Sequence, residues 1–111
     1  MKKTNRVTSN QDFVAAIKKG KTARCNSFVL HVFKNDLDYG RVGVSVSTKL
    51  GHAVTRNRIK RQLRAMCDSL INYENSQYDI IIIAKNGFLE SSYQTNYEEL
   101  CELLKKLELI K

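Results

Sequence analysis

A short apolar run, residues 80–83 (IIII), constrains the fold of this chain more than any other feature. It lies between Asp79 and Lys85, and its β-branched residues favour a strand. Because the run does not alternate with polar residues, both faces of this strand must be covered. We therefore expect a central strand with partners on both edges. The length of 111 residues suits one domain, so we expect residues 1–111 to form a single unit.

Two further segments have the composition of strands. Residues 27–33 (SFVLHVF) are rich in β-branched and aromatic side chains, and residues 41–47 (RVGVSVS) alternate strictly. A polar, turn-like stretch separates them, so we expect an antiparallel hairpin. In the second strand, Gly43, Ser45 and Ser47 share one side. That side either admits a closely approaching backbone or ligand or is an ordinary solvent face.

Helical periodicity occupies three segments. A first helix is predicted over residues 9–19, with Ser9 as its N-cap and Gly20 as its end. The segment 54–73 carries an apolar stripe at steps of three and four residues, namely Ile59, Leu63, Met66 and Leu70. The segment 93–109 has acidic residues early and lysines late, as the helix dipole favours. The order α-β-β-α-β-α, with room for one more strand near the start, indicates a two-layer α+β domain.

The cysteines and the N-terminal segment exclude several classes of protein. Three cysteines without a CxxC motif argue against a disulfide framework and against a zinc site. No apolar segment follows the basic start MKKTNRVTSNQDF, so a signal peptide is not expected. The apolar run near residue 80 is too short to span a bilayer. We expect reduced thiols, a cytoplasmic location and no membrane partner.

The positive charge of the chain is concentrated in its first part. Residues 1–64 hold fifteen Lys and Arg against three Asp and Glu, whereas residues 65–111 hold four against eight. A surplus confined to one part of the chain indicates a polyanionic partner. No acidic residue occurs between Asp38 and Asp68, which covers most of the 54–73 helix.

On that helix the cations occupy one face. At about 100° per residue, five polar residues span about 140° of the helix, away from the apolar stripe. We call this set the basic face: Arg56, Asn57, Lys60, Arg61 and Arg64. Its cations repel one another at i,i+4 spacing, and Arg56 and Arg58 stand where the helix dipole disfavours them. A bound phosphate backbone would relieve both conflicts, and the guanidinium group suits phosphate well.

The segment SVSTKLGHAVTRNRIKRQLR, residues 45–64, closely resembles the signature of the bacterial ribonuclease P protein family. The resemblance extends over essentially the whole chain. It includes NQDF (10–13), FVL (28–30), RVGVSVS (41–47) and DIIIIA (79–84), in order and at suitable separation.

This resemblance implies an α-β-β-β-α-β-α, ribosomal-protein-like fold with a left-handed βαβ crossover, against the usual handedness. It implies a protein subunit that joins a catalytic RNA in a ribonucleoprotein endonuclease. That enzyme removes the 5′ leader of precursor tRNA. The RNA, with its Mg²⁺ ions, is expected to carry the chemistry, and no catalytic residue or bound metal is expected in this chain. The expected partners are the catalytic RNA and precursor tRNA, not DNA.

The resemblance also assigns residues. Those that match the RNA-contacting motif are Lys49, Arg56, Asn57, Arg58, Lys60, Arg61 and Arg64. A cleft for the leader is implied between the first helix and the sheet, with Phe13, Ile17 and His31. Ile17 and His31 depart from the aromatic residues common there, which leaves a smaller stacking platform. The same apolar residues, Phe13 and Ile17, are also compatible with a role in the core. Thr48 replaces a common lysine.

Three other functions are weighed against this one. A self-sufficient nuclease would need clustered carboxylates or paired histidines, and His31 and His52 are the only histidines. A ribosomal or other structured-RNA-binding protein fits the charge pattern equally well. A DNA-binding helix-turn-helix is disfavoured, because a predicted strand and a Gly turn precede the basic helix.

Overall fold

The computed structural model describes residues 1–111, and its central element is the strand β4 (Tyr78–Ala84). The sheet has four strands in the order β1-β2-β4-β3. Its other strands are β1 (Lys21–Arg24), β2 (Phe28–Lys34) and β3 (Arg41–Ser45). The helices are α1 (Asn10–Lys19), α2 (Ala53–Leu70), α3 (Gly87–Glu90) and α4 (Tyr93–Lys106). The doubly buried central strand predicted from the isoleucine run is confirmed, since Ile80, Ile81 and Ile82 are buried.

The predicted hairpin between residues 27–33 and 41–47 is wrong, because β4 lies between these two strands. β2 pairs with β4 antiparallel, and β3 pairs with β4 parallel, so that Ile82 stands between Leu30 and Val44. The physical reason is the isoleucine run: a hairpin of β2 and β3 would push this apolar strand towards an edge. The hairpin partner of β2 is β1. The sequence of β1, KTAR, has no apolar pattern, and only Ala23 in it is buried.

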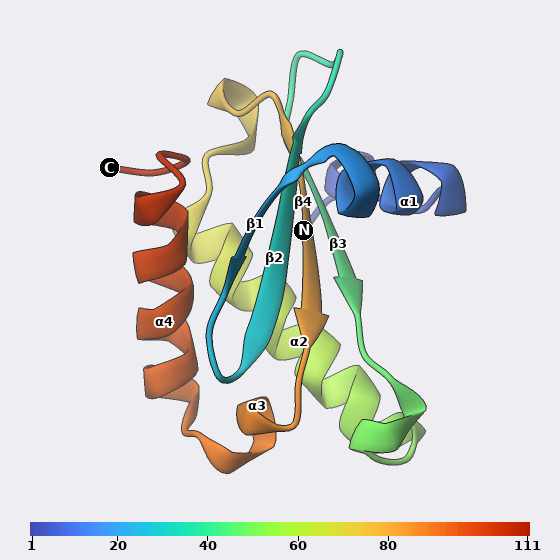
Figure 1. Cartoon of the computed structure of the whole chain (residues 1–111), viewed down its shortest axis with the longest axis vertical. Helices are drawn as coiled ribbons and strands as arrows, with labels where there is room; N and C mark the ends of the chain where they lie inside the picture. Colours follow the sequence, from blue (N-terminus) through green and yellow to red (C-terminus); the bar gives the residue numbers. More distant parts are fainter.

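Helices lie on both faces of the sheet (Figure 1). The main core lies on the face covered by α2 and α4 and includes Ile59, Leu63 and Met66 of the predicted stripe. The helix α1 packs on the opposite face, where a smaller cluster joins Ala16 to Ile81. The sheet and the α2–α4 layer therefore form the two layers, and α1 covers part of the free side.

The crossover from β3 through α2 to β4 is left-handed. β3 and β4 are adjacent and parallel, and Figure 1 shows α2 behind them with β4 to the left of β3 and both strands running downward. This is the opposite of the common handedness for such a connection. The order of the main elements agrees with the α-β-β-β-α-β-α fold implied by the resemblance.

The ends of the outer helices differ slightly from the prediction. Ser9 takes the N-cap position of α1, but its side chain makes no capping hydrogen bond. The helix α4 ends at Lys106 rather than at residue 109, because the chain reverses at Glu108, where φ is 61°. The single-turn helix α3 has no counterpart in the prediction. None of the helices combines the length and the apolar character needed to cross a membrane.

Candidate nucleic-acid interface

The helix α2 begins after a sharp change of chain direction that exposes its basic N-terminal half. Gly51 has φ 141°, a conformation that a residue with a side chain rarely adopts, and Leu50 before it is buried. The buried stripe then holds α2 on the sheet. No cation of α2 forms an ion pair, because the three ion pairs of the structure involve only Met1, Arg41 and acidic partners. These cations are therefore available to an external anion.

The basic face of α2 borders a groove of about 450 Å³. Four of its predicted residues line this groove, namely Asn57, Lys60, Arg61 and Arg64. Arg56 and Arg58, also on α2, do not line it, and neither does Lys49, which is exposed on the 3₁₀ turn Thr48–Leu50. The structure thus gathers part of the predicted set into one concave surface and leaves the rest beside it.

Arg6 also lines the groove, although no sequence pattern predicted it there. A bridge to Val42, next to a hydrogen bond from the amide of Val7 to the carbonyl of Val42 (3.0 Å), holds this N-terminal segment beside β3. Burial, and then the nearby charge of Arg6, lowers the pKa of Arg64. The Nε atoms of Arg6 and Arg56 are buried without a hydrogen-bond partner. A phosphate bound in the groove would relieve the repulsion between the crowded cations Arg6 and Arg64. Only the position of Arg6 in the basic N-terminal segment could have suggested it.

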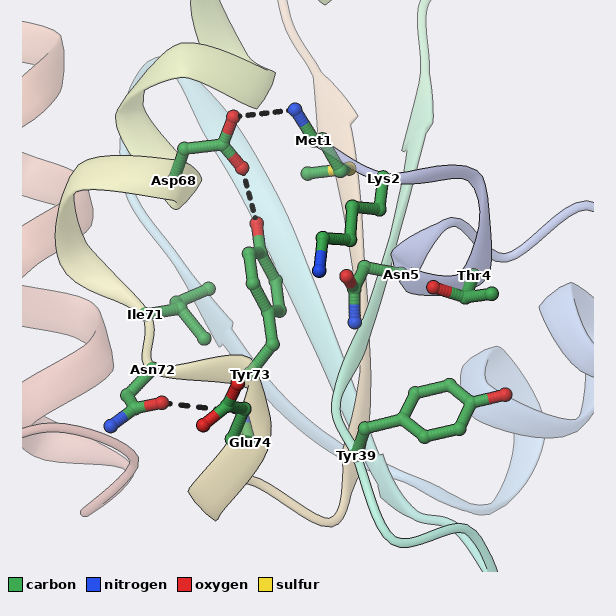
Figure 2. A pocket seen from close by; sticks show the side chains of 10 residues that line it. All are labelled: Met1, Lys2, Thr4, Asn5, Tyr39, Asp68, Ile71, Asn72, Tyr73 and Glu74. Atoms are coloured by element: carbon green, nitrogen blue, oxygen red, sulfur yellow. Dashed lines mark hydrogen bonds and ion pairs between the residues drawn. The ribbon is translucent and has the colours of Figure 1, made fainter.

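Asp68 connects the N-terminal segment to α2 at the end of this groove. One carboxylate oxygen accepts from the amino group of Met1 at 2.8 Å, and the other accepts from the Tyr73 hydroxyl at 2.9 Å. Figure 2 shows these contacts at the rim of a neighbouring pocket of about 680 Å³. Burial is the main cause that raises the pKa of Tyr73, so its hydroxyl remains a donor to Asp68. This arrangement helps to keep Arg6 beside α2.

The residues expected in the leader cleft lie on the α1 side of the sheet. Phe13 is half-buried against Gly43, where an added Cβ would lie 2.6 Å from the ring Cζ and 2.8 Å from Cδ1 of Ile81. The small-residue side of β3 therefore admits a close approach, and the approaching group is Phe13. Ile17 is 42% exposed on α1.

His31 lies on β2, opposite Ile81 of β4. Its Nδ1 is 3.1 Å from the Thr22 hydroxyl, and burial, followed by the charge of Arg24, lowers its pKa. A neutral imidazole is therefore favoured at pH 7. None of the five hollows of the structure is lined by Phe13, Ile17 or His31, so these residues form an open surface rather than a pocket.

Groups suited to catalysis or metal binding do not cluster in this chain. No three or more His, Cys, Asp and Glu side chains are placed to hold a metal ion. Cys25, Cys67 and Cys101 are free thiols. Asp79 is the most buried carboxylate, and it is bound by Arg41 and Asn35.

Comparison with known proteins decides the family. A family model described as Ribonuclease P matches residues 1–108. The chain belongs to the ribonuclease P protein family. It is 42% identical to the ribonuclease P protein component of Mesoplasma florum over 105 residues, covering 94% of this chain and 96% of that protein. It is also 42% identical to the ribonuclease P protein component of Streptococcus thermophilus, covering 100% of this chain and 99% of that protein.

Solved structures of ribonuclease P proteins have the same fold. The Staphylococcus aureus protein matches with a TM-score of 0.84 and 33% identity, covering 96% of this chain and 98% of that one. The Thermotoga maritima protein matches with a TM-score of 0.78 and 31% identity, covering 91% of this chain and 96% of that one. The chain is thus a protein component of ribonuclease P, a ribonucleoprotein endoribonuclease of tRNA processing, and it associates with the RNA of that enzyme.

Proposed function

We propose that the basic face of α2, together with Arg6, binds phosphates of the catalytic RNA subunit. The observation that carries this proposal is the groove in which Lys60, Arg61, Arg64 and Arg6 converge without an ion-pair partner. Asn57 adds an amide that can bind a phosphate or a base edge. Lys49, Arg56 and Arg58 extend the contact beyond the groove.

In the second part of the proposal, the open surface with Phe13, Ile17 and His31 receives the 5′ leader of precursor tRNA. The ring of Phe13 packs against Gly43 and Ile81, so its partly exposed face is a preformed platform for stacking of a base. The neutral side chain of His31 and the exposed Ile17 pack against bases or sugars rather than against phosphates. Such contacts are tolerant of base identity.

The side chains of this protein position RNA and take no part in bond breaking. Mg²⁺, which the resemblance to the family implies, is expected to be held mainly by the RNA subunit. When bound there, Mg²⁺ supplies the activation of water and the stabilisation of charge at the scissile phosphate. As part of the same proposal, the protein works in the cytoplasm, in keeping with its free cysteines.

The test is reconstitution with a cognate bacterial catalytic RNA. Adding the protein at low Mg²⁺ should raise the rate at which leader-bearing tRNA is cleaved at the mature 5′ end. The double variant Arg61→Ala/Arg64→Ala should lose most of this enhancement at limiting protein concentration. Gln94→Ala, an exposed change on α4, is the control. No enhancement by the unaltered protein would refute the proposal.

The leader contact has its own test. Phe13→Ala should weaken the binding of precursor tRNA to the reconstituted enzyme by about 5-fold or more, as expected for a lost stacking contact, and leave mature tRNA unaffected. Val14→Ala, at a neighbouring position that is 39% exposed, is the control. An equal loss for precursor and mature tRNA would show that Phe13 acts only in the core.

A further inference from the structure

A second group of cations lies outside the basic face. Residues 18–34 contain Lys18, Lys19, Lys21, Arg24 and Lys34, and no acidic residue occurs between Asp12 and Asp36. This stretch is as free of acidic residues as the one that covers α2. The proposed contacts with the catalytic RNA and the leader use none of these five cations.

Three of these lysines surround one hollow of about 350 Å³. Lys19 is the last residue of α1, Lys21 is the first residue of β1, and Lys34 is the last residue of β2. No acidic side chain lines the hollow, and none of the three lysines forms an ion pair. Glu108 lies in the segment between two lining leucines, but it is not itself part of the lining.

The floor of this hollow is apolar and carries a tyrosine. Lys34 stands opposite Tyr78 in the β2–β4 register, and Lys21 stands opposite Val32 in the β1–β2 register. Directly opposed residues of antiparallel strands point to the same side of a sheet. Tyr78 is therefore beside Lys34, with Leu107 and Leu109 from the C-terminal segment completing the floor. Tyr78 is 36% exposed and its hydroxyl makes no hydrogen bond within the protein.

We propose that this hollow, which we call the Tyr78 hollow, binds a short single-stranded segment of RNA. One base stacks on Tyr78 over the apolar floor, and Lys19, Lys21 and Lys34 hold the flanking phosphates. An aromatic ring between cations is the usual arrangement for binding single strands without regard to sequence. An acidic polypeptide would use the lysines but would leave the ring and the floor without a matching group.

This inference rests on the proposed function, because it adds a second contact for RNA at a different place. The basic face lies on α2, whereas the Tyr78 hollow is formed by the ends of α1, β1, β2 and β4 and by the C-terminal segment. A strand bound there would meet the protein near the C-terminal end of α1, the helix that also carries Phe13 and Ile17.

The test uses the full chain and a fluorescein-labelled ten-residue oligouridylate at low salt. Tyr78→Leu should weaken binding about 5-fold or more, whereas Tyr78→Phe should bind as the unaltered protein does. Tyr93→Leu, at a tyrosine on α4 that is 45% exposed and outside the hollow, should have no effect. Lys34→Ala should reduce the magnitude of the slope of log affinity against log salt by about 0.7. Lys85→Ala, at a lysine just beyond the other end of β4, should reduce it less. Thermal unfolding of each variant confirms folding.

A second measurement locates the contact. The same oligonucleotide with 5-iodouridine should crosslink on irradiation to the peptide that contains Tyr78. If the crosslink is absent, or Tyr78→Leu and Tyr93→Leu behave alike, the hollow does not bind RNA. If a labelled ten-residue polyglutamate depends on Lys34 while the oligouridylate does not, the partner is an acidic polypeptide and the inference is overturned. In either case, cleavage enhancement by the unaltered protein would still support the proposed function.

Discussion

Glu108 is the only non-glycine residue with a positive φ, and it shows how one residue ends a helix. The amide of Leu109 donates a hydrogen bond to the carbonyl of Leu104 at 2.9 Å. The amide of Glu108 donates one to the carbonyl of Lys105 at 2.9 Å. This left-handed reversal directs Leu109 back to the body of the protein, where it lines the Tyr78 hollow. A residue with a Cβ is strained in this conformation.

Glu108→Gly should therefore raise the free energy of unfolding by about 0.5–1 kcal/mol, because glycine adopts this conformation without strain. Urea denaturation followed by circular dichroism measures the change. Glu102→Gly, an exposed position inside α4, is the matched control and should lower the free energy of unfolding by about 1 kcal/mol. If both variants lose stability, the reversal at residue 108 is not strained.

At the scale of elements, two ion pairs that share Arg41 connect three parts of the fold. The guanidinium group of Arg41 on β3 donates to Asp79 on β4 at 2.9 and 2.6 Å, and to Asp12 on α1 at 3.2 Å. Hydrogen bonding to Asp79 is the main cause that raises the pKa of Arg41. The side chain of Asp79 is 4% exposed and that of Asp12 is 41% exposed, so the two contacts differ in strength.

Arg41→Ala should lower the free energy of unfolding by about 3 kcal/mol, because it leaves the charge of Asp79 buried without its cation. Asp12→Ala removes an exposed partner and should cost less than about 1 kcal/mol. Denaturant unfolding of both variants tests the difference. Equal losses would mean that burial does not set the strength of this network.

Some features of the elements could be predicted from local sequence patterns, and others could not. The stripe of α2 and the burial of β4 follow from side-chain periodicity within one segment, so the sequence predicted both. The pairing of β2 with β4 joins residues about 50 positions apart. A hairpin of β2 with β3, the next strand in the chain, was the simpler expectation, and it was wrong. Arg6 was missed for the same reason, since only the fold brings the N-terminal segment to α2.

Over the whole molecule, the positive and negative charges are unevenly distributed among the elements. The cations of residues 1–64 lie on α2, the N-terminal segment, α1 and the edge of the sheet, whereas α4 carries exposed acidic residues such as Glu98 and Glu102. Such a distribution orients the protein as it approaches a polyanion, because α4 is repelled from it.

RNA binding should therefore weaken steeply with salt. With about five phosphate contacts, the slope of log affinity against log salt should be about −3.5 for single strands and about −4.5 for duplex RNA. Titration with the catalytic RNA between low and physiological ionic strength measures it. A flat response would contradict phosphate binding by the basic face.

Alkaline pH should destabilise the fold. Burial raises the pKa of Cys67 to about 12 and also raises the pKa values of Cys25 and Tyr73. The unfolded chain loses these protons first, so their contribution to stability is complete below about pH 9 and is lost as the pH rises towards 12. Cys67 alone contributes a slope of at most about 1.4 kcal/mol per pH unit. Urea unfolding in reducing buffer should show a shallower decline in Cys67→Ala, and an unchanged decline would contradict the assignment.

Local sequence patterns were sufficient to predict the three longer helices, the strands β2, β3 and β4, the buried faces of α2 and β4, and the charged residues available for RNA, because each depends on the spacing of residues within one segment. Only the tertiary structure decided the strand order, the addition of Arg6 to the basic groove, the seating of Phe13 on Gly43 and the assembly of the Tyr78 hollow. Each of these brings together residues distant in the chain, and their proximity depends on which packing buries the isoleucine run on both faces.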